Sequence, residues 1–292
     1  MTIRELKKKG AEVLGGRDTA ILDCEVLMCF LLDKTKEQLI TDSEDEVDKF
    51  NASMFMEYVR KVGRGYPVAY VTGEKEFYGL NFFVDERVLI PRPETELIVE
   101  KALEYLNEVK SEHDKSGEKC GFRILDVGTG SGNVAVAVAK NFDCDAIDEI
   151  EAVDISEGAV EIAKINAAQY GFENLINIFQ SDLLEIVEND EFYDLITANL
   201  PYIGTESNNL VDENVKKNEP MLALYGGSTG VELYKKLFQQ IKDKNIGFGC
   251  LIGEFGFGQR KEVEELLNTY FEHKWIVLKD LAGIDRVFVI KN

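Results

Sequence analysis

Short apolar runs alternate with segments of helical periodicity from residue 122 to the end of the chain, and this alternation restricts the possible folds most. Strands joined through helices by short loops form a mostly parallel sheet that is covered on both faces. The last two strands are connected by the short stretch DLAGID, which predicts an antiparallel pair at the sheet edge. The sequence therefore indicates an α/β, seven-stranded, doubly wound (Rossmann-like) fold.

The predicted elements of this region are short and evenly spaced. The strands are expected near residues 122–127, 148–153, 175–180, 192–198, 247–253, 274–279 and 285–290. The helices between them are expected near residues 131–141, 156–170, 229–244 and 258–271. With 45% apolar residues among 292, the chain can bury a sizeable core.

The N-terminal region has only helical periodicity. The stretch TAILDCEVLMCFLLD predicts a helix with Thr19 or Asp18 as its N-cap. The stretch SEDEVDKFNASMFMEYVRKV predicts a second helix, which begins at a capping box formed by Ser43 and Glu46. These patterns indicate a small all-α N-terminal domain.

A segment rich in aromatic residues and glycine follows. It predicts a β-hairpin that turns near Gly79. Residues 93–109 then predict a helix, and residues 110–121 read as a polar linker. The chain is thus expected to have three parts: a helical domain of residues 1–65, a hairpin linker of residues 66–92, and the α/β domain of residues 93–292.

Charge and composition weigh against several classes of function. Lys and Arg number 33 against 54 Asp and Glu, so the formal net charge is −21 and the surface repels a phosphate backbone. The five cysteines are scattered without a CxxC pair, and neither of the two histidines has a ligand-spaced neighbour. We therefore expect reduced thiols and no metal. The stretch MTIRELKKKGAEVL lacks an apolar targeting core, and no membrane-length span is found. We expect a cytoplasmic monomer without a membrane or nucleic-acid partner.

The stretch ILDVGTGSGNVAVAVA carries the strongest local signal. An apolar strand reaches Asp126 and continues into a loop with Gly128, Thr129, Gly130 and Gly132. Glycines allow a tight turn and a close approach to a ligand. The spacing is GxGxG, which does not satisfy the dinucleotide pattern GxGxxG. Because the acid would oppose a pyrophosphate, the loop favours a cationic ligand such as S-adenosylmethionine over other nucleotides.

Acidic residues also follow the next two predicted strands. Asp154, beside Ile155, is placed to accept hydrogen bonds from both ribose hydroxyls, although it could merely cap the helix that starts at Ser156. Asp182 is placed to bind the adenine amino group, with the Leu183 backbone N–H beside it. An ordinary turn acid is the alternative for Asp182.

The stretch TANLPYI ends the fourth predicted strand with Asn199, Leu200, Pro201 and Tyr202. Asn and Pro are common loop formers, so an ordinary turn is one interpretation. The other is a site for methylating a nitrogen conjugated to a π-system. The Asn199 side-chain oxygen and the Leu200 carbonyl can accept both NH2 protons, Pro201 can fix the backbone, and Tyr202 can provide a flat wall. No histidine base is required, because the proton becomes acidic only after methylation.

These motifs together resemble the peptide-chain release factor glutamine N5-methyltransferases. The resemblance lies in GYPVAYVTGEKEFYGLNFFVDERVLIPRPETELIVE, the glycine loop, ITANLPYI, NEPMLALYGGSTGVELYKKL and the closing LAGIDRVFVIK. It implies a helical domain, a hairpin linker and a seven-stranded methyltransferase domain. It also implies S-adenosylmethionine as cofactor, S-adenosylhomocysteine as product, and as substrate the glutamine of the Gly-Gly-Gln loop in class-1 release factors.

Two positions depart from the family pattern. The family usually has Asn-Pro-Pro-Tyr, and Leu200 replaces the first proline. Thr229 occupies the position at which the family's GG-x-DG segment usually has an acid. The resemblance therefore implies for the glycines of this segment only a role in backbone shape: Gly226, Gly227 and Gly230. The residues Glu94, Thr95 and Glu96 of the PRPETE block have no role that the sequence defines.

Two other functions are compatible with parts of the sequence. Asn-Leu-Pro-Tyr also resembles the motif of the ribosomal RNA adenine dimethyltransferases, so an adenine N6-methyltransferase acting on RNA or DNA is the main alternative. The net charge and the PRPETE block argue against it. A non-catalytic cofactor-binding module would not need the amide of Asn199 beside the crevice.

Overall fold

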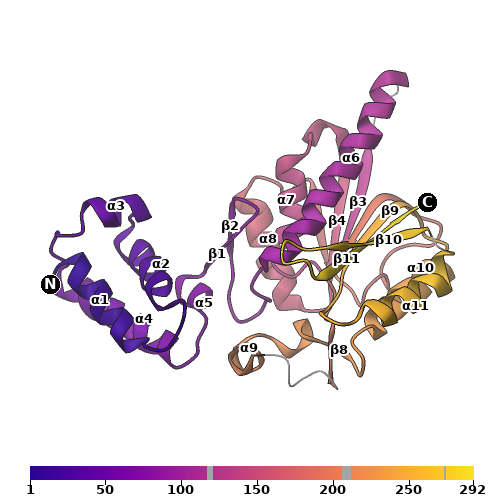
Figure 1. The fold of residues 1–292 in the computed structure, drawn as a ribbon. Helices are drawn as coiled ribbons and strands as arrows, with labels where there is room; N and C mark the ends of the chain where they lie inside the picture. Colours follow the sequence, from indigo (N-terminus) through magenta and orange to yellow (C-terminus); the bar gives the residue numbers. More distant parts are fainter. Residues whose placement is uncertain (117–120, 206–211, 273) are drawn as a thin grey trace. The chain divides into compact units, whose positions relative to one another are not determined.

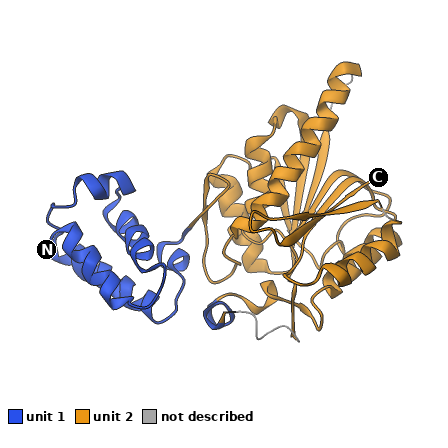
Figure 2. Cartoon of the chain, viewed as in Figure 1, with its two compact units in different colours: residues 1–74, 213–218 blue, residues 75–212, 219–292 orange. Residues whose placement is uncertain are grey.

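A computed structural model of the chain describes residues 1–116, 121–205, 212–272 and 274–292. These residues form two compact units, which are coloured separately in Figure 2. The helical unit contains Met1–Glu74 and Glu213–Asn218, and the α/β unit contains Lys75–Asp212 and Glu219–Asn292. The segment Glu213–Asn218 therefore belongs to the helical unit, although it lies far along the chain from the rest of that unit.

The helical unit is built from short helices around one apolar core. The helices that contribute to this core are α1 (Ile3–Val13), α2 (Ala20–Leu32), α3 (Lys36–Thr41), α4 (Lys49–Gly63) and α5 (Val68–Thr72). The short helix α9 (Glu213–Asn218) also belongs to the unit but has no buried residue. Cys24, Leu27, Phe55 and Val59 are completely buried in the core. Each such apolar side chain stabilises the unit by about 1.5–3 kcal/mol relative to exposure.

The start of α4 differs from the prediction. The capping box of Ser43 and Glu46 is wrong, because Asp48 is the N-cap and its carboxylate accepts hydrogen bonds from the backbone N–H groups of the next turn. Glu46 instead forms an isolated β-bridge with Thr2. For α2, Thr19 is the N-cap as predicted, although its side chain makes no capping hydrogen bond.

A two-stranded sheet of β1 (Glu74–Phe77) and β2 (Leu80–Phe83) follows. Its two-residue turn, Tyr78 and Gly79, has φ values of 52° and 73°, as a type I′ hairpin requires. The predicted turn near Gly79 is therefore confirmed. The Tyr78 backbone N–H donates to Glu96 Oε1 over 2.9 Å, which anchors the hairpin to the helix that follows.

That helix is longer than predicted. A short 3₁₀ turn, η1 (Pro93–Thr95), leads into α6 (Glu96–Ser116). The helix includes the first seven residues of the stretch interpreted as a polar linker, and residues 117–120 lie outside the described residues. The linker prediction was wrong because it was based on the polarity of this stretch, and an exposed helix surface also tolerates charged side chains. Here Lys110 and Asp114 form an i,i+4 ion pair that supports the helix.

The α/β unit contains a seven-stranded sheet of order β10-β11-β9-β6-β3-β4-β5. Its strands are β3 (Phe122–Val127), β4 (Ile147–Asp154), β5 (Ile176–Gln180), β6 (Phe192–Ala198), β9 (Gly247–Glu254), β10 (Trp275–Lys279) and β11 (Asp285–Lys291). The five strands from β5 through β4, β3 and β6 to β9 are parallel to one another. Strand β11 pairs antiparallel with β9 and with β10, which lies at the edge as predicted. The α/β, doubly wound fold is confirmed.

Helices cover both faces of this sheet (Figure 1). Helices α6, α7 (Asn133–Asn141) and α8 (Glu157–Gln169) pack side by side on one face, and α10 (Glu232–Asp243) and α11 (Arg260–Phe271) cover the other. Smaller elements are η2 (Cys144–Ala146), η4 (Met221–Ala223) and the parallel pair β7 (Ile203–Gly204) and β8 (Tyr225–Gly227). Because five neighbouring strands are parallel, their carboxyl ends meet at one edge of the sheet.

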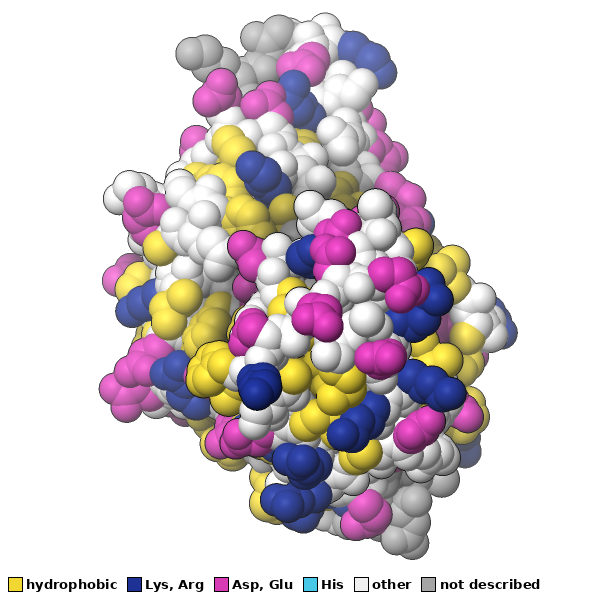
Figure 3. Space-filling model, turned by 90° about the vertical axis from the view of Figure 1, so that its left-hand side faces the viewer, with side chains coloured by type: hydrophobic (Ala, Val, Ile, Leu, Met, Phe, Trp, Pro, Cys, Tyr) yellow, Lys and Arg dark blue, Asp and Glu magenta, His cyan; other side chains and the backbone are white. Residues whose placement is uncertain are grey.

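The surface carries both signs of charge. On the face drawn in Figure 3, acidic and basic side chains are interspersed, with apolar side chains between them. In the part of the chain that the structure describes, no helix has the length and apolar character needed to cross a membrane. The described cysteines are free thiols, with Cys24 and Cys250 buried.

Candidate active site

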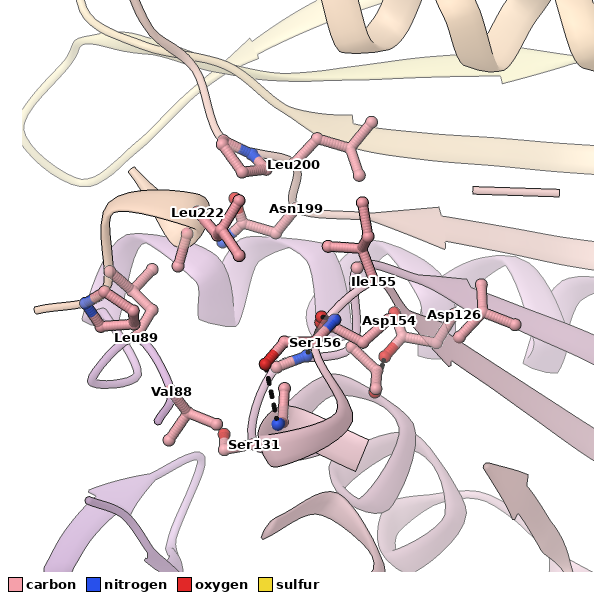
Figure 4. Close-up of a pocket in the computed structure, with 18 of the residues that line it drawn as sticks. Val88, Leu89, Asp126, Ser131, Asp154, Ile155, Ser156, Asn199, Leu200 and Leu222 are labelled. Atoms are coloured by element: carbon pink, nitrogen blue, oxygen red, sulfur yellow. Dashed lines mark hydrogen bonds between the residues drawn. The ribbon is translucent and has the colours of Figure 1, made fainter. Parts of the chain in front are cut away.

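A cavity of about 230 Å³ opens at the carboxyl edge of the parallel strands, entirely within the α/β unit. Eleven of the predicted site residues line it: Asp126, Gly128, Thr129, Gly130, Asp154, Ile155, Asp182, Leu183, Asn199, Leu200 and Pro201. Two predicted site residues, Gly132 and Tyr202, are not among the lining residues. Figure 4 shows Val88, Leu89 and Leu222 across the cavity from Asp126 and Asp154.

The glycine loop between β3 and α7 needs its glycines for two reasons. Gly128 has φ 74°, and a Cβ there would lie 3.0 Å from the Leu200 side chain. Gly130 has φ 55°, and a Cβ there would meet no atom within 4 Å, so this position borders open space. Gly132 instead packs against Ala163 of α8, where a Cβ would lie 3.2 Å from its methyl group. Gly132 thus sets helix packing behind the loop.

Asp126 is buried at the end of β3. Its two carboxylate oxygens accept hydrogen bonds from the hydroxyls of Thr129 and Thr197, each over 2.7 Å. Burial raises the pKa of Asp126 to about 6, against the opposing effect of these two hydrogen bonds. The two hydrogen bonds fix the orientation of this carboxyl group at the cavity wall.

Asp154 connects two loops at the end of β4. Its carboxylate accepts hydrogen bonds from the backbone N–H groups of Gly130 and Ser156, each over 2.9 Å. The N-cap of α8 is Ser156, whose hydroxyl accepts from the Ala159 N–H. Burial raises the pKa of Asp154, while the backbone hydrogen bonds oppose that rise. A carboxylate has further lone pairs, so Asp154 can still accept bonds from a ligand.

Asp182 lies after β5 with its side chain about one-third exposed, and it forms an ion pair with Lys236 of α10 through one oxygen, Oδ2, over 2.5 Å. Its other oxygen has no hydrogen-bond partner among the described residues. The neighbouring Leu183 has a positive φ of 54°, a strained value that turns the chain sharply at the cavity.

Asn199 follows β6, and the surrounding chain fixes its amide. Its Nδ2 donates to Thr95 Oγ1 over 3.0 Å, and Thr95 Oγ1 donates to Glu254 Oε2 over 2.7 Å. Among the described residues, none donates a hydrogen bond to Asn199 Oδ1 or to the Leu200 carbonyl. The Leu200 side chain is buried in the core against the glycine loop, which explains how leucine can replace the family's proline.

Tyr202 turns toward Glu254, and its hydroxyl donates to Oε1 over 3.1 Å. Burial raises the pKa of Tyr202, and the nearby Glu254 carboxylate adds to that rise. The aromatic residue that lines the cavity itself is Tyr225 of β8. Gln259 donates to the Tyr202 carbonyl over 2.6 Å and so holds the end of the Asn-Leu-Pro-Tyr turn.

The glycine-rich segment before α10 supports the same turn. A Cβ on Gly226 would lie 2.0 Å from the Pro201 carbonyl oxygen, and one on Gly230 would lie 2.1 Å from the Tyr202 carbonyl oxygen. Glu232 closes the segment by accepting hydrogen bonds from the backbone N–H groups of residues 228–230. Burial acts to raise the pKa of Glu232, but the hydrogen bond from the Ser228 hydroxyl and the backbone N–H bonds outweigh it and lower the pKa to about 2.

Sequence reasoning missed several residues that shape the site. Glu254 is completely buried at the end of β9, and its position after an apolar strand is the one signal that could have identified it. Glu219 forms an ion pair with Arg92 over 2.6 Å and accepts from the Ile90 N–H over 3.2 Å, which holds one cavity wall. Thr95 lacked any sequence signal, because its partners lie more than 100 residues away.

The donor set fits S-adenosylmethionine. Carboxylates follow three neighbouring strands, whereas both lining arginines are paired with acids: Arg87 with Asp85 and Glu161, and Arg92 with Glu219. This charge pattern suits a cationic ligand with a ribose diol and disfavours a pyrophosphate. Within the described ranges, no group of three or more His, Cys, Asp or Glu could hold a metal ion.

Comparisons with known proteins place both parts of the chain in known families. Residues 5–73 match the PrmC N-terminal domain, and residues 124–216 match a methyltransferase domain. A release factor glutamine methyltransferase of Koribacter versatilis is 35% identical over 99% of this chain and 98% of its own length. One from Bacillus subtilis is 34% identical over 90% of this chain and 88% of its own length.

A solved structure supports the fold alone. The hMettl16 catalytic domain, crystallised in complex with the MAT2A 3′UTR hairpin 6, has a TM-score of 0.52 and 15% identity. The match covers 77% of this chain and 80% of that one. The family and the activity are instead assigned from the two relatives and the methyltransferase-domain match. The chain belongs to the release factor glutamine methyltransferase family and is an S-adenosylmethionine-dependent methyltransferase.

Proposed function

We propose that this chain methylates the side-chain amide nitrogen of the glutamine in the Gly-Gly-Gln motif of class-1 peptide-chain release factors. The observation that carries the proposal is the pair of acceptors after β6. Asn199 Oδ1 and the Leu200 carbonyl belong to consecutive residues, both of which line the cavity. A primary amide has two N–H donors on one nitrogen, and two adjacent acceptors match that group.

The chemistry requires this kind of site because an amide nitrogen is a poor nucleophile. Its lone pair is delocalised into the carbonyl. Acceptors on both hydrogens orient the nitrogen and stabilise the positive charge that develops on it during methyl transfer. Asn199 and Leu200 supply these acceptors, and Pro201 keeps the backbone between them and Tyr202 fixed. Tyr225, the aromatic side chain among the cavity-lining residues, is expected to cover one face of the planar amide in place of Tyr202.

The cofactor would be held along the ends of β3, β4 and β5. Bound S-adenosylmethionine supplies a methyl group activated by the positive sulfonium. The loop of Gly128, Thr129 and Gly130 would hold the methionine part beside the Asp126 carboxylate, with Gly132 supporting the loop. Asp154 and Ile155 would contact the ribose, and Asp182 Oδ1 and the Leu183 backbone N–H would contact the adenine.

Transfer of labelled methyl groups tests this function. The purified chain is incubated with labelled S-adenosylmethionine and offered a class-1 release factor or ribosomal RNA in separate reactions. A release factor with the loop glutamine replaced by alanine is the matched control. Label on the release factor that disappears in the control supports the proposal. Label on RNA would contradict it and favour the adenine N6-methyltransferase.

A further inference from the structure

A buried carboxyl group lies behind the proposed acceptor pair without contacting the cavity. Glu254 ends β9 with no exposed surface, and it accepts hydrogen bonds from two hydroxyls: Thr95 at 2.7 Å and Tyr202 at 3.1 Å. Thr95 is itself only 2% exposed, and its oxygen also receives the Asn199 amide N–H at 3.0 Å. An unbroken chain of hydrogen bonds therefore joins Glu254 to Asn199.

The direction of each bond in this chain follows from the carboxylate. An ionised carboxylate can only accept hydrogen bonds, so Thr95 must donate its single hydroxyl proton to Glu254. The Thr95 oxygen can then only accept from Asn199. This requires the NH2 end of the Asn199 amide to face Thr95 and leaves Oδ1 available to the cavity.

We infer that Glu254, acting through Thr95, determines which end of the Asn199 carboxamide faces the substrate, and that both are positioning residues for methyl transfer. The inference rests on the proposed function, in which Asn199 Oδ1 accepts an N–H of the substrate amide. Neither Glu254 nor Thr95 has to touch the reacting atoms to fulfil this role.

Protonation of Glu254 removes the constraint. A neutral carboxyl can donate its own proton to the Thr95 oxygen, and the Thr95 hydroxyl is then able to donate to Asn199 Oδ1. The Asn199 NH2 group would turn toward the cavity and oppose the NH2 group of the substrate. Activity is therefore expected to fall as Glu254 becomes protonated.

The surroundings of Glu254 place this protonation near neutral pH. Burial raises the pKa of Glu254 to about 7, the hydrogen bonds from Thr95 and Tyr202 and the charge of Arg286 on β11 oppose the rise, and Glu94 adds to it. Arg286 is itself paired with the Asp280 carboxylate. Tyr234 of α10 donates to the Glu254 backbone carbonyl over 2.6 Å and stays a neutral phenol, because burial raises its pKa.

Substitutions at Thr95 test the positioning role directly. Thr95→Val keeps the side-chain shape and removes the hydroxyl, so kcat on the release factor is expected to fall by about tenfold or more. Calorimetric affinity for S-adenosylmethionine should stay within about twofold. Thr95→Ser, which restores the hydroxyl, should recover most of the loss. A Thr95→Val enzyme with the parent kcat would overturn the inference.

Thr72→Val is the matched control for removing a buried threonine hydroxyl. Thr72 is 7% exposed, belongs to the helical unit, and donates only to backbone carbonyls of its own segment. Its kcat is expected to equal that of the parent protein. If Thr72→Val lost as much kcat as Thr95→Val, the loss would reflect general destabilisation, and the inference would fail.

A pH profile separates positioning from simple structural support. The parent enzyme is expected to lose kcat as the pH falls through about 7, because the ionised form of Glu254 is the active one. Glu254→Gln cannot titrate, so its kcat should be lower at high pH but should lack this acid limb. An unchanged acid limb in Glu254→Gln would assign the titration to another group and contradict the inference.

A measurement without the protein substrate distinguishes the two proposals. The side-chain NH2 signals of Asn199 in an amide nitrogen spectrum can be assigned by their loss in Asn199→Ala. In the parent protein they should shift with an apparent pKa near 7, and in Glu254→Gln they should not. Asn199 NH2 signals whose chemical shifts do not change with pH in the parent protein would overturn the inference. A normal titration with no methylation of a release factor would support the positioning role and contradict only the proposed substrate.

Discussion

Asn199 has two chemically different ends, and the site uses both. Its NH2 group is bound to Thr95, whereas its oxygen remains available at the cavity. Replacing it with alanine should remove one acceptor of the substrate amide without disturbing the loops that hold the cofactor. Asn199→Ala is therefore expected to lower kcat by about a hundredfold or more while leaving cofactor affinity almost unchanged. Single-turnover kinetics and calorimetry check the two quantities, and lost cofactor affinity would contradict this role.

For Asp154 we expect a substitution to lower cofactor affinity, because in the proposed function this residue binds the cofactor and does not orient the nucleophile. Asp154→Ala should weaken S-adenosylmethionine binding by ~2 kcal/mol, or about thirtyfold, through the loss of charge-assisted hydrogen bonds to the ribose. Calorimetry measures this directly. Glu157→Ala, a change to an exposed acid at the start of α8, is the charge-matched control and should bind normally. An unchanged affinity in Asp154→Ala would place the ribose contact elsewhere.

At the scale of single residues, the sequence identified candidate site residues where they follow a predicted strand. Asp126, Asp154 and Asn199 could be placed at one sheet edge because parallel strands end together. Thr95 and Glu254 could not be paired in this way. Their hydrogen bond joins positions 159 residues apart, and only the folded chain brings the two side chains together.

The elements around the Asn-Leu-Pro-Tyr turn leave no room for an added side chain. Gly226→Ala would place a methyl group 2.0 Å from the Pro201 carbonyl oxygen, so the turn must move. We expect both a lower melting temperature and a large loss of kcat. Gly63→Ala is the control, because its Cβ would meet only a Leu14 methyl group at 3.5 Å. A fully active Gly226→Ala enzyme would show that the turn does not require this packing.

Element boundaries show where sequence patterns stop being informative. The strands agree with prediction to within one or two residues, because buried parallel strands appear as continuous apolar runs. The start of α4 and the end of α6 were wrong, since both depended on polar residues. Asp48 and not Ser43 is the N-cap of α4, because the segment before it makes tertiary contacts such as the bridge from Glu46 to Thr2.

At the scale of the whole molecule, the buried acid that serves the site should cost stability. Because the pKa of Glu254 is raised from 4.5 to about 7, the folded state holds this proton more tightly than the unfolded chain. The free energy of unfolding therefore falls as pH rises through this window. Glu254→Gln removes the penalty, so its melting temperature relative to the parent should increase from pH 5 to pH 8. A constant difference across this range would contradict the raised pKa.

The overall architecture was largely predictable, because strand–helix alternation and the hydrophobic pattern determine a doubly wound sheet. The assignment of α9 to the helical unit was not, since Glu213–Asn218 follow β7 of the other unit in sequence. Short polar helices of this kind have no hydrophobic periodicity of their own. Their position depends on tertiary contacts such as the hydrogen bond from Asn218 Nδ2 to the Gly65 carbonyl, at 3.0 Å.

The central claim is that this chain methylates one glutamine side chain of a release factor. Peptide mass spectrometry of a class-1 release factor, before and after incubation with the chain and S-adenosylmethionine, tests it most directly. The account predicts the added mass of one methyl group on the side-chain amide of the Gly-Gly-Gln glutamine, and about a hundredfold slower addition with the Asn199→Ala enzyme. A methyl group on any other residue, or an unmodified release factor beside methylated RNA, would contradict the account.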